Sequence, residues 1–397
     1  MRVRHIQIPL LMLVLTAMAC ASFGGAAQTP TPAVQLTAAA AATQAARLPA
    51  ATGTAPGDVA TDAKPAAGTD LSNSGTADTP RLAYDASGTL HLVWFDKSAR
   101  AGGDYFHRQL TAAGAWSTAE NLTADFGDLY GDLNLLRDAS GHMCVVFSAA
   151  KASADPATIG LYQRCQAGAA WAPADKLSVT TQTGVGVRDY SVVRAADGSV
   201  HALYIAGSSS VYFDNIQLSS DTLAAGGALA IDKAGGYHAV WVNEGSPFSV
   251  QYRFSSDQGQ TWQPAVTLST DQNAPDGGAL SLVADGVGNV HLLWSGTDVF
   301  YRRWTSAAGW VAPVALAGGQ NGPDQDLAVD AQGLARASWA NHNGGLPYVL
   351  QAVSGQWSAP RILANVESAA PRLAVDAQGG SHVAWLTNQD VYYLAVP

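Results

Sequence analysis

The stretch Asp85-Ala-Ser-Gly88-Thr-Leu-His91-Leu-Val-Trp94 contains the phrase that decides the fold, because the chain repeats it. Three further copies keep the same spacing of Asp, Gly, His and Trp, and three degenerate copies keep part of it. The seven copies lie about 48 residues apart and begin at Asp85, Asp138, Ala195, Asp232, Asp285, Asp330 and Asp376. A period near 50 residues is typical of stacked units such as propeller blades or solenoid coils.

Each repeat has the pattern of four antiparallel strands. One apolar run precedes the Asp/Gly turn and a second follows it, as in residues 90–94. A third run carries aromatic residues, and a Gly-x-Trp turn such as Gly114-Ala-Trp116 leads into a fourth run. We therefore predict an all-β fold, a β-propeller of seven four-stranded blades. A six-bladed ring is the alternative if the short third unit is degenerate.

The recurring tryptophans and histidines are interpreted as structural residues. Ten of the eleven Trp residues fall at two positions of the repeat, which favours packing between blades over ligand stacking. Metal binding needs ligands that converge, whereas the histidines occur about once per blade around a ring. No D-x-D-x-D-G calcium loop is present, so we predict no cofactor, and calcium has no motif to support it.

The charge balance excludes two classes of partner. The chain of 397 residues has 31 acidic and 21 basic side chains and a formal net charge of −10. Such a chain has no basic surface for nucleic acid or for an anionic membrane. Only three of the acidic residues are Glu, at Glu120, Glu244 and Glu367. We expect a monomer whose partner is a glycan or a surface protein.

The first 79 residues predict export and a tether. Residues 1–19 have a positive start, an apolar run and small residues before Cys20, which is the pattern of a signal peptide. This stretch resembles a bacterial lipoprotein signal, which implies lipidation of Cys20 and a cell-surface location; a free secreted protein is the alternative. Residues 20–79 are rich in Ala, Thr and Pro and predict a disordered tether. We therefore place the propeller domain at residues 80–397.

One turn shows a family resemblance. The segment Ser255-Ser-Asp257-Gln-Gly259-Gln-Thr261-Trp262 resembles the Asp box of bacterial neuraminidase repeats in sialidase-like propellers. The resemblance implies a turn between the third and fourth strands of a blade, in which the Asp accepts backbone hydrogen bonds and the Trp enters the core. In that family the Asp boxes lie on the face of the propeller opposite the active site.

The resemblance also implies which residues a sialidase active site would contain. Sialidases hold the substrate carboxylate with three Arg residues and use a Tyr nucleophile activated by a Glu, with an Asp as acid/base. The family's Arg-Ile-Pro phrase is missing here. The phrases at Pro80-Arg81 and Pro371-Arg372 put Pro on the other side of Arg and belong to the repeat. The sequence therefore leaves an enzyme undecided and favours a binding module.

Candidate ligand-binding residues are those that break the repeat on the face formed by the loops from second to third strands and by the loops between blades. Amides and carboxylates at a shallow pocket suit sugar hydroxyls. The acidic residues that begin first strands could also converge on the axis, where they would bind a cation or polarise a glycosidic bond. The candidates are Asp96, Asp132, Arg188, Asp189, Asn243, Glu244, Asp276, Asp298, Asp326, Asn341, His342 and Asn388.

Two features stay open. If Trp294 pairs with Val299, the same register puts Cys144 opposite Gln163 and makes Cys165 its diagonal neighbour, so the alternatives are a disulfide and a free buried thiol. The seventh unit has only three strands. An N-terminal strand would complete it, although residues 65–79 have low strand propensity.

The function expected from these observations is a non-catalytic module that binds a glycan or a protein. A sialidase-like glycoside hydrolase is the first alternative. A structural component of an envelope assembly is the second, and it would require a large apolar patch on one face.

Overall fold

The structure is a computed structural model that describes residues 68–396 apart from short gaps. The described ranges are 68–111, 113–153, 155–178, 187, 189–206, 210–219, 223–245, 247–270, 280–296, 298–318, 321–341, 344–365 and 369–396. The predicted signal peptide, Cys20 and most of the predicted tether lie outside these ranges. No helix within them is long and apolar enough to cross a membrane.

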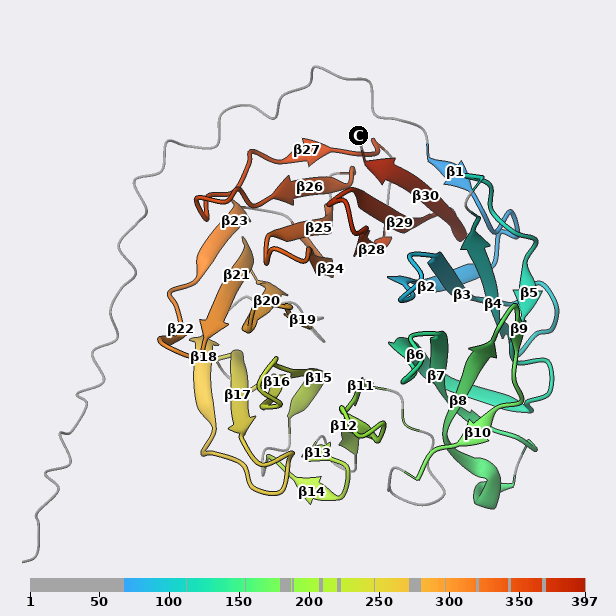
Figure 1. Ribbon diagram of the computed structural model, residues 1–397, viewed down its shortest axis with the longest axis horizontal. Helices are drawn as coiled ribbons and strands as arrows, with labels where there is room; N and C mark the ends of the chain where they lie inside the picture. Colours follow the sequence, from blue (N-terminus) through green and yellow to red (C-terminus); the bar gives the residue numbers. More distant parts are fainter. Residues whose placement is uncertain are drawn as a thin grey trace, which may run out of the picture. The chain divides into compact units, whose positions relative to one another are not determined.

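Seven antiparallel sheets follow one another around a ring, as predicted (Figure 1). In each sheet the first strand lies nearest the axis and the last lies at the periphery. Blades one and two are built from β2 (Ala77–Tyr84), β3 (Leu90–Asp96), β4 (Asp104–Leu110) and β5 (Glu120–Asn121), then β6 (Asp128–Arg137), β7 (Met143–Ala150), β8 (Ile159–Ala167) and β10 (Asp175–Lys176), with β9 (Ala170–Trp171) beside β8. A single 3-10 turn, η1 (Pro156–Thr158), precedes β8.

The remaining blades have the same order of strands. Blades three and four contain β11 (Tyr190–Arg194), β12 (Val200–Ala206), β13 (Ser210–Phe213) and β14 (Ile216–Gln217), then β15 (Ala224–Ile231), β16 (Tyr237–Asn243), β17 (Ser249–Ser255) and β18 (Val266–Thr270). Blade five contains β19 (Leu280–Ala284), β20 (Asn289–Ser295), β21 (Asp298–Thr305), β22 (Gly309–Trp310) and β23 (Val314–Gly318). Blade six contains β24 (Asn321–Val329), β25 (Ala335–Asn341), β26 (Pro347–Leu350) and β27 (Arg361–Ile362).

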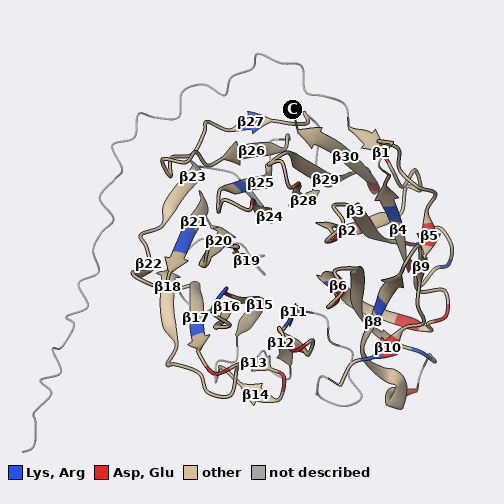
Figure 2. Ribbon diagram, viewed as in Figure 1, with Lys and Arg blue, Asp and Glu red and all other residues tan. Residues whose placement is uncertain are grey.

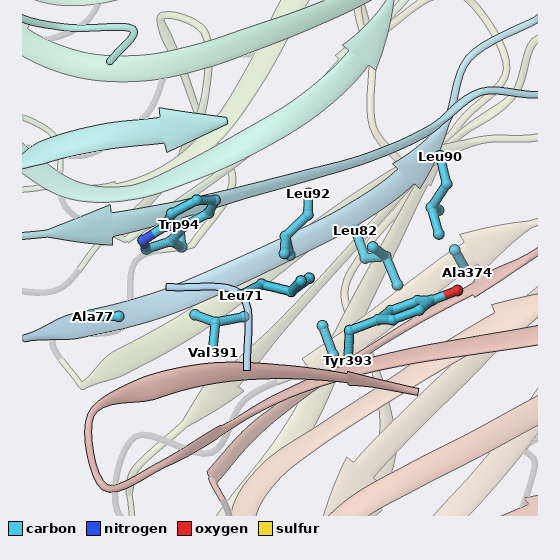
Figure 3. Close-up of a cluster of buried hydrophobic side chains, with 10 residues drawn as sticks. Leu71, Ala77, Leu82, Leu90, Leu92, Trp94, Ala374, Val391 and Tyr393 are labelled. Atoms are coloured by element: carbon cyan, nitrogen blue, oxygen red, sulfur yellow. The ribbon is translucent and has the colours of Figure 1, made fainter. Parts of the chain in front are cut away.

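Blade seven closes the ring with a strand from the other end of the domain. It contains β28 (Ala369–Val375), β29 (Ser381–Thr387) and β30 (Asp390–Val396), and β1 (Thr69–Asp70) pairs with β30 as its outermost strand. Leu71 follows β1 and is buried against Val391 and Tyr393 in the cluster that joins blades seven and one (Figure 3).

The predicted domain boundary at residue 80 is therefore wrong. Residues 68–79 belong to the propeller, although their composition is poor for a strand. β1 needs only two residues, because hydrogen bonds to the edge of β30 and the burial of Leu71 hold it there instead of its own propensity.

Seven hydrophobic clusters fill the seven interfaces between neighbouring blades, and each combines residues of two blades. Tryptophans from the second strands are buried in five of them; Trp241, for example, is 1% exposed. The tryptophans of the fourth-strand turns pack from the neighbouring blade, as Trp262 does against Phe213. The recurring Trp positions are thus explained by blade packing.

The repeat phrase forms a buried hydrogen-bonded triplet. In blade four, Asp232 Oδ1 accepts the backbone N–H groups of residues 234 and 236 and closes the turn. Its Oδ2 lies 3.1 Å from His238 Nε2, and Tyr252 OH lies 2.9 Å from His238 Nδ1. Because a carboxylate only accepts, Nε2–H donates to Asp232 and the Tyr252 hydroxyl donates to Nδ1.

The same triplet recurs in blade five, where His291 lies between Asp285 and Tyr301, and in blade seven. Arg336 replaces the histidine in blade six and donates to Asp330 Oδ2. The recurring histidines in these blades are structural, as the sequence indicated.

Cys144 takes the histidine position in blade two and forms a disulfide with Cys165. The two residues lie directly opposite each other on β7 and β8, so the diagonal register predicted for them is wrong. That register rests on an expected pairing of Trp294 with Val299. This pairing is also wrong, because Trp294 lies opposite Phe300. Hairpin register depends on the length and shape of the loop, and the β7–β8 loop contains the extra turn η1.

The Asp box connects β17 to β18 in blade four. Thr261 N–H donates to Asp257 Oδ1 at 2.9 Å, and Trp262 Nε1 donates to the carbonyl of Gly259 at 3.0 Å. Hydrogen bonds from the Thr261 hydroxyl, the Thr261 N–H and the Ser255 hydroxyl lower the pKa of Asp257 to about 2, and the Thr261 hydroxyl is the largest cause. Gly259 has φ +83°, and a Cβ there would lie 2.3 Å from the Phe213 ring. Only glycine fits this position.

Candidate functional site

The candidate site is a cavity of about 520 Å³ on the axis of the ring, lined by the innermost strands of all seven blades. Polar side chains from six blades line it. They include Arg81, Asp132, Asn134, Asp189, Tyr190, Ser281, Gln325, Asp326 and Arg372.

β-Bulges aim several of these side chains. The inner strands β2, β6, β15, β24 and β28 each contain a register shift near the start of the strand. Arg81, Gln325 and Arg372 are the first residues to pair after a bulge, and Asp132 lies within one. A bulge bends its strand and redirects the neighbouring side chains, so the cavity is built where the regular pleat is interrupted.

Arg81 joins the first two blades. It forms an ion pair with Asp132, donates from Nε to the carbonyl of Leu133 at 3.2 Å and donates from Nη1 to the carbonyl of Pro80 at 3.0 Å. The other carboxylate oxygen of Asp132 is buried and has no hydrogen-bond partner among the described residues. Asp132 thus has an unused hydrogen-bond acceptor at the wall of the cavity.

Asp326 and Arg372 form the second charged group of the cavity. Asp326 accepts the backbone N–H of Leu373 at 2.7 Å and the hydroxyl of Ser281 at 3.2 Å, so it connects blades five, six and seven. Burial raises the pKa of Asp326, and the charge of Arg372 opposes that shift. Burial, followed by the like charge of Arg81, lowers the pKa of Arg372 to about 10. The two guanidinium groups thus carry like charges into the same cavity.

Two tyrosines support the bulge of β6. Tyr105 donates to the carbonyl of Gly131 at 2.8 Å, and Tyr190 donates to the carbonyl of Asp132. Burial raises the pKa of both phenols well above the ordinary value, and the nearby Asp132 charge adds to the shift. Both hydroxyls are therefore protonated donors, and neither is prepared to act as a nucleophile.

The cavity thus presents two guanidinium groups, three carboxylates, amides and hydroxyls, which can accept and donate hydrogen bonds over a small volume. None of the described residues that line it is Glu. In the described part of the chain, no group of three His, Cys, Asp or Glu residues is arranged to hold a metal ion.

Three of the predicted candidates meet in this cavity: Asp132, Asp189 and Asp326. Arg188, Asp276 and His342 lie outside the described residues. Asn243, Glu244, Asp298 and Asn341 lie at the ends of second and third strands, away from the cavity lining. Asn388 lines a different cavity, between blades one and seven.

Asp96 is not a ligand-binding candidate in the structure. Its side chain is 2% exposed and accepts hydrogen bonds from Thr76 Oγ1, Trp94 Nε1 and the backbone N–H of Ser98. Burial, the largest single effect, raises the pKa of Asp96, but hydrogen bonds from Ser74, Ser98 and Thr76 lower it by more, so the net shift is downward. The carboxylate is fully used in holding the end of β3.

Sequence reasoning missed Arg81 and Arg372, which were set aside as part of the repeat. The phrase Pro-Arg-Leu occurs at these two positions of the chain, so it marks two units out of seven. The occurrence of this phrase in two units out of seven was the sequence signal that could have identified the two arginines as candidate site residues. The chain positions 291 residues apart become neighbours only because the ring closes.

No protein-family model matches the chain, and no curated protein matches it in sequence. Solved structures do resemble it. The lectin BP39L from Burkholderia pseudomallei has a TM-score of 0.59 and 12% identity, over 80% of this chain and 98% of that chain. A protein of unknown function from Dyadobacter fermentans DSM 18053 has a TM-score of 0.52 and 12% identity, over 84% and 99%.

The Hadza microbial sialidase Hz136 has a TM-score of 0.50 and 13% identity, over 83% of this chain and 68% of that chain. At such low identities the likeness concerns the fold alone. The chain has a sialidase-like β-propeller fold.

Proposed function

We propose that this sialidase-like β-propeller is an exported glycan-binding module that holds its ligand in the axial cavity without cleaving it. The observation that carries the proposal is the convergence of Arg81, Arg372 and three Asp carboxylates on one polar cavity. Guanidinium groups donate to sugar oxygens in a fixed fork, and carboxylates accept from pairs of hydroxyls. The unpaired oxygen of Asp132 adds an acceptor that is already desolvated.

Two features favour binding over turnover. Tyr190 is the tyrosine in the lining, and its raised pKa disfavours the phenolate that a nucleophile would require. The Arg81–Asp132 ion pair also fixes Asp132 as a charged carboxylate, which suits a hydrogen-bond acceptor better than a proton donor to a leaving group. A lectin with the same fold supports the proposal only at the level of architecture.

The second candidate is a sialidase-like glycoside hydrolase. The presence of Arg81 and Arg372 at one cavity favours it, because two guanidinium groups suit an acidic sugar. A hydrolase would also need an acid/base, for which Asp189 is the exposed carboxylate at the cavity.

A glycan array, run together with a fluorogenic sialoside and a panel of aryl glycosides, separates these functions. We expect the purified full chain to bind a glycan saturably and to cleave none of the chromogenic substrates. Asp189→Asn, which leaves the packing intact, should weaken binding about tenfold, because one charge-assisted hydrogen bond is lost. The matched control is Asp175→Asn on the outermost strand of blade two, where the side chain is exposed and far from the axis.

Cleavage that Asp189→Asn abolishes would instead identify a hydrolase. If neither assay gives a signal, a protein partner replaces the glycan as the proposed ligand.

Export and anchoring are part of the same proposal. The apolar run before Cys20 and the low-complexity residues after it support a lipoprotein that carries the propeller away from the membrane surface.

A further inference from the structure

A second cavity, of about 460 Å³, lies where the ring closes between blades one and seven. One wall is the start of β2 and the end of β3, and the other is the start of β28 and the β29–β30 turn. Its lining includes Asp78, Phe95, Lys97, Asn388 and Gln389. This cavity is separate from the axial one, because the two share no lining residue.

The walls are tied together before any ligand arrives. The backbone N–H of Ala77 donates to the carbonyl of Gln389 at 2.8 Å, which links the two blades. Thr76 donates to Asp96 at 2.8 Å, and Trp385 Nε1 donates to Thr387 Oγ1 at 3.2 Å. These contacts hold the backbone of both walls and so preorganise the cavity.

Three polar side chains at the cavity are left for a ligand. Asn388, Gln389 and Lys97 are exposed, and within the described ranges no hydrogen bond or ion pair holds their side-chain heads. Asp78 Oδ1 accepts only the N–H of the next residue, Thr79, at 2.7 Å. Phe95 is half-buried beside them, and its ring packs edge-on against Tyr105.

Unusual backbone conformations gather at the same place. Asn388 and Gln389 have φ of +54° and +61°, and Thr79 and Ala370, next to the lining, have φ of +43° and +48°. These are four of the seven non-glycine residues with positive φ in the described part of the chain. Asn-Gly is the favoured pair for such a two-residue turn, so Gln389 stands where glycine would be less strained. Strain kept at a cavity suggests that the side chain has a use there.

The chemistry of these groups matches one sugar residue. Side-chain amides and a carboxylate bind neighbouring hydroxyls, and an aromatic ring packs against the C–H face of a pyranose. We infer that the cavity at the ring closure is a second binding site, for a single pyranose residue, in which Gln389, Asn388, Asp78 and Lys97 contact the hydroxyls. Two sites on one chain would increase avidity for a surface covered in glycans.

Glutamine-to-glycine substitutions test the inference. Gln389→Gly removes the amide and relaxes the turn, so we expect a higher Tm together with about tenfold weaker binding at this site. Gln258→Gly is the matched control, because Gln258 also has φ +61° but lies in the Asp box of blade four. It should raise the Tm in the same way and leave binding unchanged.

Binding of the methyl glycosides of mannose, galactose, glucose, fucose and N-acetylglucosamine to the full chain is measured by saturation-transfer NMR and titration. The axial variant Asp189→Asn is tested alone and combined with Gln389→Gly. Glycoside binding that survives Asp189→Asn and falls in the combined variant supports the second site. Binding lost in Asp189→Asn alone, or unchanged by Gln389→Gly, overturns the second site and leaves the axial one. Binding that only Gln389→Gly affects overturns the axial site instead, and a silent panel overturns both.

Discussion

At the scale of the residue, His291 illustrates how the repeat phrase stabilises a blade. The imidazole is 0% exposed and lies between the Asp285 carboxylate, 3.0 Å from Nε2, and the Tyr301 hydroxyl, 2.7 Å from Nδ1. Burial lowers the pKa of His291, and the partner carboxylate opposes that shift only in part. The folded protein therefore keeps this ring neutral at a pH where an unfolded chain would protonate it.

Acid should destabilise the protein, and the size of the effect should depend on the number of histidines whose pKa is lowered by burial. A histidine whose pKa is lowered by folding stabilises the protein fully above about pH 6.5. That contribution is lost as the pH falls from 6.5 toward the folded-state pKa, which is about 3 for His107. Each such ring adds at most about 1.4 kcal/mol per pH unit to the slope. The residues are His91, His107, His238, His291 and His382.

We therefore expect the free energy of unfolding in urea to fall between pH 7 and pH 5. His291→Gln should lower the stability at pH 7 and make the slope shallower by about one proton. A slope that is the same in His291→Gln and in the unaltered protein would contradict this account.

At the scale of the element, the two-residue strand β1 holds the segment before blade one against blade seven. Asp390, at the start of β30, accepts hydrogen bonds from Ser72 Oγ at 3.0 Å, Ser74 N at 2.6 Å and Gly75 N at 2.8 Å. Gly68 is so close to Trp385 that a Cβ would lie 2.3 Å from the indole. Residues 68–75, which precede blade one, are thus packed onto blade seven and close the ring.

A chain that begins at residue 76, which keeps β2 whole, should be less stable than one that begins at residue 61. It loses the burial of Leu71, about 2 kcal/mol, and leaves the edge of β30 unpaired. Scanning calorimetry should show a lower Tm for the shorter chain, and light scattering should show that it aggregates at lower protein concentration. Equal Tm values for the two chains would mean that β1 does not close the ring.

The Cys144–Cys165 disulfide stabilises blade two. It closes a loop with a sequence separation of 21 residues, for which loop entropy predicts about 3 kcal/mol. Adding dithiothreitol should lower the Tm of the unaltered protein to that of the double variant Cys144→Ala, Cys165→Ala. The double variant itself should not respond to the reductant, and a response there would point to a different cause.

At the scale of the whole molecule, closure of the ring brings charged side chains of distant blades to one cavity. Acidic and basic side chains are scattered over the blades with both signs present around the ring (Figure 2). The axial cavity gathers charges from blades that are far apart in the chain, as in the approach of Arg81 to Arg372. The ring is therefore the unit that forms the candidate site, and no single blade contains it.

The proposed anchor belongs to this scale. When the full chain is expressed in a bacterium with radiolabelled palmitate, we expect label in the protein and recovery in the membrane fraction. Cys20→Ser should carry no label and should appear in the soluble exported fraction. Label retained in Cys20→Ser would exclude Cys20 as the lipid-bearing residue.

The sequence by itself determined the all-β class, the seven units and the blade packing of Trp241 and its equivalents. These follow from local periodicity, which repeats in every unit and is visible in any window of about 50 residues. Only the tertiary structure decided that β1 completes blade seven, that Cys144 lies opposite Cys165, and that Arg81 and Arg372 share the axis. The reason is physical: edge pairing, hairpin register and β-bulges depend on contacts between distant segments, and those contacts exist only once the ring has closed.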